Sequence, residues 1–354
     1  MSEQRPADYT EGSVISSILK MGVPSMLGFL TQNIYTLVDT WWVSRLPEGE
    51  KAVAALTFFG AILMFLFSFN QLVGPGSVAV ISRRYGEKNY HLAEKAIKET
   101  LLLKLFFGFF FGGIGFVFAP DLLYMVGARG EVLKIGVAYA SIMFLALGLP
   151  YAMYSVFTAL RGIANPHQSM ILMIASNLLN MGLDPLFMFG WFGFPAMGIR
   201  GAAVASVISF AVTLGVGLVM LYGGFANVRL HVVGKAGVTL ASMWKLLRIG
   251  FPAWIGSLSF SGGRLVIAPL VATFGTAVVA AYGVGMQIVG FSVMVIVGIG
   301  LGLSSLIGHN LGGEKTDRAR QTGNQAIMPS VGIMVVFGLV CFLMAEPIMK
   351  LFFS

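Results

Sequence analysis

ILKMGVPSMLGF, at residues 18–29, recurs in altered form as LLRIGFPAWIGS at residues 246–257. Both copies hold glycine, proline and glycine at matching places, so that Pro24 aligns with Pro252 at an offset of 228 residues. Further along, GPGSVAVISRRYGEKN matches GLGLSSLIGHNLGGEKT at nearly the same offset. Self-similarity over so long a period indicates a repeated structural unit. The chain is therefore predicted to contain two copies of one unit.

The composition indicates the environment in which both copies fold. Of 354 residues, 57% are hydrophobic and only 11% are charged, whereas a soluble domain carries about 25% charged residues. A membrane-crossing helix needs about 20 apolar residues. Nine stretches qualify, at residues 14–44, 53–82, 100–119, 132–155, 169–190, 196–222, 243–272, 277–308 and 325–345. We therefore predict an all-α, polytopic membrane protein.

The positive charges gather on alternate turns between these predicted spans. With the N-terminus placed in the cytoplasm, the inside segments hold more than twice as many Lys and Arg residues as the outside segments. This positive-inside pattern predicts a multi-pass protein of the plasma (inner) membrane with a cytoplasmic N-terminus. It also explains the net charge of +8 without nucleic acid as a partner. No Walker A motif occurs, so ATP is not expected to be the direct energy source.

The repeat offset covers six predicted spans, so both copies must cross the membrane in the same direction. Such parallel repeats are related by a pseudo-two-fold axis along the membrane normal. We expect a six-helix N-terminal lobe at residues 13–222, a cytoplasmic linker at 223–242, and a partial C-terminal lobe of three helices at 243–354. Because the second copy stops halfway, we expect the sequence to be a fragment of a longer protein.

Asp39 and Asp184 are the acidic residues that lie well inside predicted spans. Ionisable residues within a membrane are rare, and their default interpretation is functional. Each aspartate belongs to a polar stripe with helical spacing. The members are Gln32, Thr36 and Asp39 in the first span, and Ser169, Ser176, Asn177, Asn180 and Asp184 in the fifth. One polar stripe per helix indicates a face turned toward a cavity or a partner helix.

Pro185 follows Asp184 and lacks an N–H group, so the carbonyl of Met181 loses its usual helical partner. A free carbonyl near Asn180 and Asp184 is an oxygen ligand for a cation or for water. Burial, in turn, favours the protonated form of a carboxyl group. The pattern predicts that Asp39 and Asp184 bind a proton or a small cation. The alternative is that both carboxylates tie helices together and never change protonation.

Several motifs of the chain resemble those of the MATE family, the multidrug and toxic compound extrusion transporters. They are GVPSMLGFLTQNIYTLVDTWWVSRL in the first span, ISRRYGEKNYHLAEKAI after the second, ALRGIANP after the fourth, NLLNMGLDPLF in the fifth and GIRGAAVAS opening the sixth. The resemblance covers nearly the whole chain. It implies a fold of twelve helices in two six-helix lobes, from which this chain departs by ending after nine predicted spans.

The resemblance also implies a function and a site. A MATE protein is a secondary-active multidrug exporter that exchanges H⁺ or Na⁺ for amphipathic, often cationic, organic compounds by alternating access, without a cofactor. We expect the full-length protein to be a monomer. The coupling site implied by the resemblance and the polar stripes comprises Asp39, Asp184, Asn180, Thr36, Tyr139 and Ser206. Na⁺, if it is the coupling ion, would bind at Asp39, Asn180 and Asp184.

Other residues are candidates for the substrate cavity and for hinges. Gln32, Tyr35 and Asn177 lie on or beside the polar stripes and are predicted to line the cavity. Pro24 and Pro252 occupy equivalent places in the first spans of the two copies. Kinks there would permit the bending that alternating access needs. The alternative is a static kink that only aids packing.

Two competing functions can be weighed against export. A lipid-linked precursor flippase of the same wider superfamily would line its cavity with basic residues for a pyrophosphate, and Arg264 alone is weak support for it. An intramembrane aspartyl protease would carry a G-x-G-D motif, which neither TLVDTW nor GLDPLF matches. The chain is therefore not expected to be an enzyme.

Overall fold

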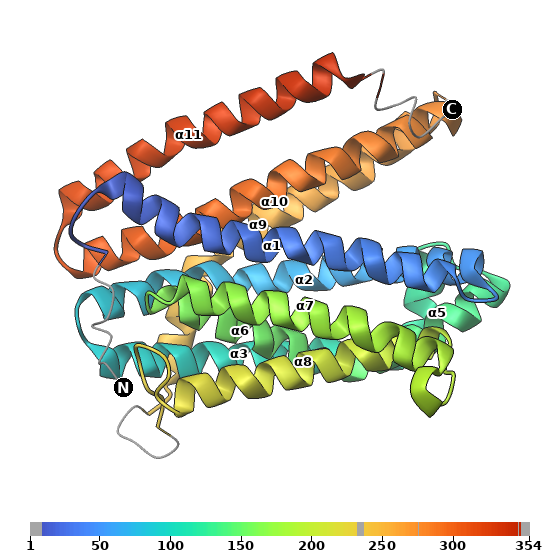
Figure 1. Cartoon of the computed structure of the whole chain (residues 1–354), viewed down its shortest axis with the longest axis horizontal. Helices are drawn as coiled ribbons and strands as arrows, with labels where there is room; N and C mark the ends of the chain where they lie inside the picture. Colours follow the sequence, from blue (N-terminus) through green and yellow to red (C-terminus); the bar gives the residue numbers. More distant parts are fainter. Residues whose placement is uncertain (1–8, 232–236, 275, 346, 348–354) are drawn as a thin grey trace.

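The computed structural model describes residues 9–231, 237–274, 276–345 and 347, and omits some side chains between residues 261 and 292. Its regular elements are all helices (Figure 1). The first eight are α1 (Val14–Ser44), α2 (Gly49–Gly86), α3 (Tyr90–Val117), α4 (Ala119–Met125), α5 (Gly130–Leu145), α6 (Gly148–Gly162), α7 (Pro166–Phe189) and α8 (Ile199–Tyr222), with the short 3₁₀ turn η1 (Trp191–Gly193) before α8. Three more follow: α9 (Leu240–Ala272), α10 (Thr276–Gly312) and α11 (Thr316–Leu343).

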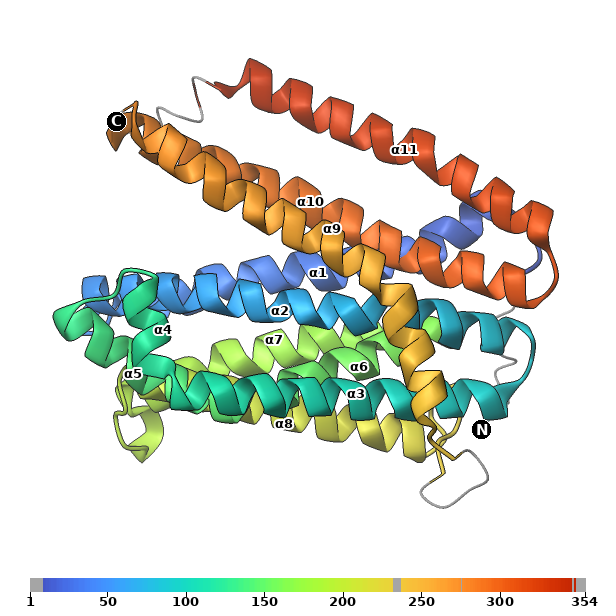
Figure 2. The same cartoon turned by 180° about the vertical axis from the view of Figure 1, so that it is seen from behind.

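These helices form one bundle with three further helices beside it. Figure 2 shows α10, α11 and the second half of α9 on one side of α1 and α2, and α3 to α8 on the other side, while the first half of α9 crosses α2 toward α3. Among the described residues, seven helices are long and apolar enough to cross a membrane, or eight if α5 and α6 count as one span. α9 covers the seventh predicted span but is not among these, and part of its side chains lie outside the described residues.

The fourth predicted span, at 132–155, is not one continuous helix. α5 and α6 meet at an angle of 51°. Pro150 has no N–H to donate to the carbonyl of Ala146, and the backbone N–H of Leu149 donates to that carbonyl instead, at 2.8 Å. Together α5 and α6 pass as one bent span, and hydropathy alone does not detect the local break at a proline.

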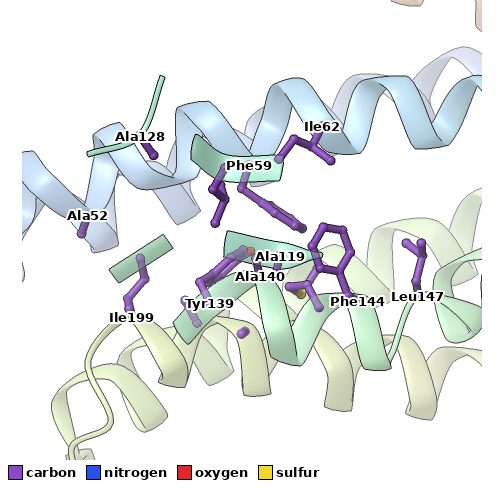
Figure 3. Packing of buried hydrophobic residues seen from close by; sticks show 14 of the residues in the cluster. Ala52, Phe59, Ile62, Ala119, Ala128, Tyr139, Ala140, Phe144, Leu147 and Ile199 are labelled. Atoms are coloured by element: carbon purple, nitrogen blue, oxygen red, sulfur yellow. The ribbon is translucent and has the colours of Figure 1, made fainter. Parts of the chain in front are cut away.

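Aromatic side chains pack α2 against α5 in one half of the bundle. The ring of Phe59 on α2 lies edge-on to Tyr139 and to Phe144 of α5, with centroids 5.2 Å and 5.4 Å away (Figure 3). Such edge-to-face pairs add to the stabilisation that burial alone gives. This packing fixes the position of the Tyr139 hydroxyl. A sequence pattern cannot predict that position.

Glycines let the two copies touch backbone to backbone at one end. A Cβ atom on Gly86 would lie 2.2 Å from the carbonyl oxygen of His309, and one on Gly312 would lie 2.0 Å from that of Arg83. Each residue of the first contact is 226 positions from its counterpart in the second. At the other end, a Cβ atom on Gly290 would meet nothing within 4 Å. The copies therefore touch at the inner end, where α1 begins, and diverge toward the outer end (Figure 2).

The first helix of each copy packs on the other copy near its proline. Before Pro24, α1 lies against α10, where the Cβ position of Gly302 would be 2.5 Å from the carbonyl oxygen of Met21. After Pro24, α1 also packs on α7, where Gly28 approaches Met173, while Gly298 of α10 still lies against Met26. α9 repeats this arrangement, because Gly250 lies against the backbone of α2 just before Pro252.

The backbone contact at Gly86 gives a test of this interface. Gly86→Ala should lower the free energy of unfolding by about 1–3 kcal/mol, because the added methyl group has no room. Gly113→Ala is the matched control, since its Cβ position is open and alanine favours a helix. Thermal unfolding of both variants in detergent measures the difference. Equal melting temperatures would contradict the close backbone contact.

Candidate functional site

The polar stripes of α1 and α7 face one another across the bundle. The side-chain nitrogen of Asn177 donates a hydrogen bond to Thr31 Oγ1 at 3.1 Å. α7 begins with Pro166 at its first turn and ends at Gly190, which has a left-handed φ of 75°. Both are ordinary start and stop signals, so the helix carrying Asp184 is defined by its own sequence.

Ser206 of α8 lies at the centre of a buried polar cluster. Its hydroxyl is 3.1 Å from a side-chain atom of Asn180 and 3.5 Å from the hydroxyl of Tyr35. Three helices, α1, α7 and α8, thus contribute to one cluster. Because unsatisfied polar groups are costly when buried, this cluster constrains how these helices pack.

The Asn180 amide has two orientations with different chemical consequences. In one, its nitrogen donates to Asp184 Oδ2 at 3.0 Å while its oxygen accepts from the hydroxyl and the backbone N–H of Ser206, each at 3.1 Å. In the other, the nitrogen faces Ser206 and the amide oxygen faces the carboxyl group. Two acceptors then meet, which requires a proton on Asp184 or a cation nearby. The first orientation suits an ionised Asp184.

Both aspartates are buried without a basic partner. Asp184 is 0% exposed and Asp39 is 8% exposed, and the two lie close enough for their charges to interact. Asp39 Oδ1 has no hydrogen-bond partner. Within the described part of the chain, neither carboxylate forms a salt bridge. A purely structural role would need permanent partners, and those are missing for Asp39.

A cavity of about 460 Å³ opens beside this cluster. Its polar lining includes six of the predicted site residues: Gln32, Tyr35, Thr36, Asp39, Tyr139 and Asn177. Its apolar lining comes mainly from aromatic and methionine side chains, among them Phe59, Phe67, Phe157, Phe210, Met143, Met153 and Met173. Asn180, Asp184 and Ser206 do not line the cavity. They form the buried layer behind it, joined to the wall through Tyr35.

The other predicted residues lie as follows. The Thr36 hydroxyl donates to the backbone carbonyl of Gln32 at 3.0 Å rather than to an aspartate. Pro24 is buried in α1 and Pro252 is exposed on α9, and neither touches the cavity. Tyr154 and Thr57 also line the cavity and were missed. Neither stands in a polar stripe, so periodicity gave no signal for them.

Two basic residues are buried in the bundle. Arg161 falls between the fourth and fifth predicted spans, but it belongs to α6 and is only 2% exposed. Lys104 lies within the third predicted span, midway along α3, and is 1% exposed. Arg161 is therefore a buried cation near the inner end of the bundle.

The chain is similar in sequence to known transport and multidrug resistance proteins. The chain is 29% identical over 344 residues to the probable multidrug resistance protein YoeA of Bacillus subtilis (strain 168), covering 97% of this chain and 74% of that protein. It is 26% identical over 343 residues to the FAD transporter of Shewanella oneidensis (strain MR-1), covering 95% of this chain and 74% of the transporter.

The fold is also that of solved transporter structures. The chain superposes with a TM-score of 0.87, at 23% identity, on the outward-facing conformation of a multidrug resistance MATE family transporter of the MOP superfamily, covering 99% of this chain and 77% of that one. This confirms the all-α membrane fold, partial relative to that structure. The MatE family model matches residues 24–186 and 252–354, which is more than half of the chain. The protein therefore belongs to the MatE family, whose members are transporters and not enzymes.

Proposed function

We propose that the protein is a secondary-active multidrug exporter that exchanges H⁺ or Na⁺ for amphipathic, often cationic, organic compounds. The observation that carries the proposal is a carboxylate on the wall of an aromatic cavity, backed by a second, buried carboxylate. Asp39 faces the cavity, and Asp184 lies behind it in the cluster around Ser206. A cavity with this lining attracts organic cations through aromatic faces and charge.

Protonation would act on the helix contacts of the cluster. When Asp184 is ionised, it accepts from Asn180, and Asn180 accepts from Ser206. A proton on Asp184 favours the opposite amide orientation, in which Asn180 donates to Ser206. The hydrogen bond between Asn180 and the Ser206 hydroxyl then reverses its direction, whereas the backbone N–H of Ser206, which can only donate, loses the amide oxygen as an acceptor. Proton binding is thereby coupled to the packing around Tyr35, which reaches the cavity wall.

Na⁺ would use the same oxygens. Asp39, Asp184 and the amide oxygen of Asn180 supply hard ligands, which suit this ion. Binding Na⁺ at Asn180 requires the amide orientation in which its oxygen faces Asp184. The two ions therefore favour the same orientation and would compete at one site.

The cavity lining favours an exporter of cations over a flippase. The lining includes no Lys or Arg among the described residues, whereas a pyrophosphate needs basic groups. The side chain of Arg264, the sequence feature that suggested a flippase, lies outside the described residues. The names of the two relatives differ in cargo, so the substrate itself is inferred from the cavity alone.

Alternating access would move the two copies against one another. We propose the lobe boundaries 13–222 and 243–354, with 223–242 as linker, a cytoplasmic N-terminus in the plasma membrane, and a monomer when full length. Pro24 and Pro252 are the proposed hinges, because each lies in the part of a first helix that packs against the other copy. Rocking of the copies has to bend both helices at these places.

The first test replaces each carboxylate by its neutral isostere. Asp39→Asn and Asp184→Asn should each reduce ion-gradient-driven dye efflux from vesicles to the level of protein-free vesicles, because neither variant can exchange a proton or hold Na⁺ by charge. Asp121→Asn, at an exposed position of α4, is the matched control. Normal gradient-dependent efflux by either site variant, with unchanged melting temperature, would show that its carboxylate is structural.

The second test concerns the hydroxyl at the centre of the cluster. Ser206→Ala should lower the free energy of unfolding by about 1–3 kcal/mol, because Asn180 and Tyr35 lose a buried partner. Ser209→Ala is the control one turn further on. Its hydroxyl is buried without a partner, so its loss should leave stability nearly unchanged. Chemical denaturation measures the free energy of unfolding of the two variants. Equal losses of stability would show that the Ser206 hydroxyl has no special role.

A further inference from the structure

A buried arginine lies just beyond the inner end of the cavity. Arg161 follows Phe157, which lines the cavity, by one turn of α6. Its guanidinium donates to Ser169 Oγ at 3.3 Å and lies 5.9 Å from the ring of Phe29. Three helices, α1, α6 and α7, thus meet at this side chain.

The partners of Arg161 are themselves one turn beyond cavity residues. On α7, Ser169 precedes the lining residue Met173 by four positions. On α1, Phe29 precedes the lining residue Gln32 by three. Arg161 and its two partners thus lie on the side of the cavity that faces the inner end of the bundle.

The charge of Arg161 is not neutralised by a carboxylate. Tyr154 is the titratable group that interacts with it, and its Nε atom is buried without a hydrogen-bond partner. Lys104 is a second buried basic residue, 1% exposed. Among the described residues, neither side chain forms an ion pair. A guanidinium remains protonated in proteins, so the positive potential here persists.

We propose that Arg161 is an electrostatic barrier that keeps cations from leaking between the cavity and the inner end of the bundle. The inference rests on the proposed function, because it takes the cavity to hold cations. In a low-dielectric interior an uncompensated charge acts over many ångströms, and a fixed arginine excludes protons and cations from other membrane pores in this way. Asp39 attracts a cation into the cavity, and Arg161 prevents its further passage.

The potential at the cavity floor can be measured with thiol reagents of opposite charge. Cys341 is first replaced by serine, because it is the single cysteine, and Ser176→Cys then places a reporter in the cavity lining. The measurement is the ratio of modification rates by a cationic and an anionic methanethiosulfonate. Arg161→Met and Arg161→Gln should raise this ratio about fivefold or more. Arg161→Lys, which keeps the charge, should leave the ratio near that of the parent.

Controls separate the local charge from general effects. Arg200→Gln removes the same charge from an exposed position at the start of α8, and it should not change the ratio. Equal ratios for Arg161→Met, Arg161→Gln and Arg161→Lys, at unchanged melting temperature, would overturn the proposal. If neither neutral Arg161 variant folds, the ratio in the parent protein is compared at two reporters, Ser176→Cys and Thr57→Cys, the second on the α2 wall of the cavity. The ratio must be lower at Ser176→Cys, and equal ratios overturn the barrier.

Ion leak tests the barrier itself. Vesicles containing the protein without organic substrate should lose an imposed pH gradient several-fold faster with Arg161→Met than with Arg161→Lys, as followed by a pH-sensitive dye. A changed reagent ratio with no faster leak would show that the arginine sets the potential but does not seal the path, which overturns the proposal. The reagent ratio does not depend on transport. Failure of the parent protein to export dye would therefore refute only the proposed function.

Discussion

A charge inside a membrane protein must find a partner, reach water or be neutralised by a proton, and this constraint organises the structure. Three buried charged groups stand in different relations to this constraint. Glu94 of α3 is paired, since it accepts from Lys98 at 2.7 Å and from the backbone N–H of His231 at 2.7 Å. Asp39 faces a cavity. Arg161 has neither a carboxylate partner nor a place in the cavity lining. Asp39 and Arg161, which form no salt bridge among the described residues, are the groups with a proposed role in transport. Glu94, which is paired, holds the chain in place.

The paired carboxylates determine where the two copies can move. Glu94 holds the chain at His231, and Glu99 accepts from the backbone N–H of Thr239 at 3.0 Å. The chain between the copies is thus fastened to α3 on both sides of residues 232–236. α9 begins directly after the second attachment, and its first turns pack on α2 through Leu246. Motion of the second copy must therefore occur beyond these turns, and Pro252 is the first helix-weakening residue there.

The sequence predicted most of the fold because its signals are local or periodic. Apolar length located the spans, and the repeat placed Pro24 opposite Pro252 in the alignment. Periodicity also identified the stripe of α7 that holds Asn180 and Asp184. Periodicity failed for features that depend on how the helices pack against one another. Nothing in the sequence around Arg161 shows that α1 and α7 cover its side chain, and no pattern on α8 distinguishes Ser206, which has partners, from Ser209, which has none.

Arg161 belongs both to the proposed barrier and to the contact between the two copies at the inner end. Ser305 of α10 donates to the backbone carbonyl of Arg161 at 2.8 Å, and the ring of His309 lies 2.7 Å from the carbonyl of Gly162. These are carbonyls at the end of α6, where a helix leaves acceptors without internal partners. When α10 moves away, those acceptors lose their partners and the last turn of α6 is free to rearrange. Opening of the inner end then moves the backbone that carries the guanidinium. The contact between α10 and the end of α6 thus both closes the inner end and positions the charge of Arg161. A cation would therefore meet the closed interface and the charge together, or neither of them.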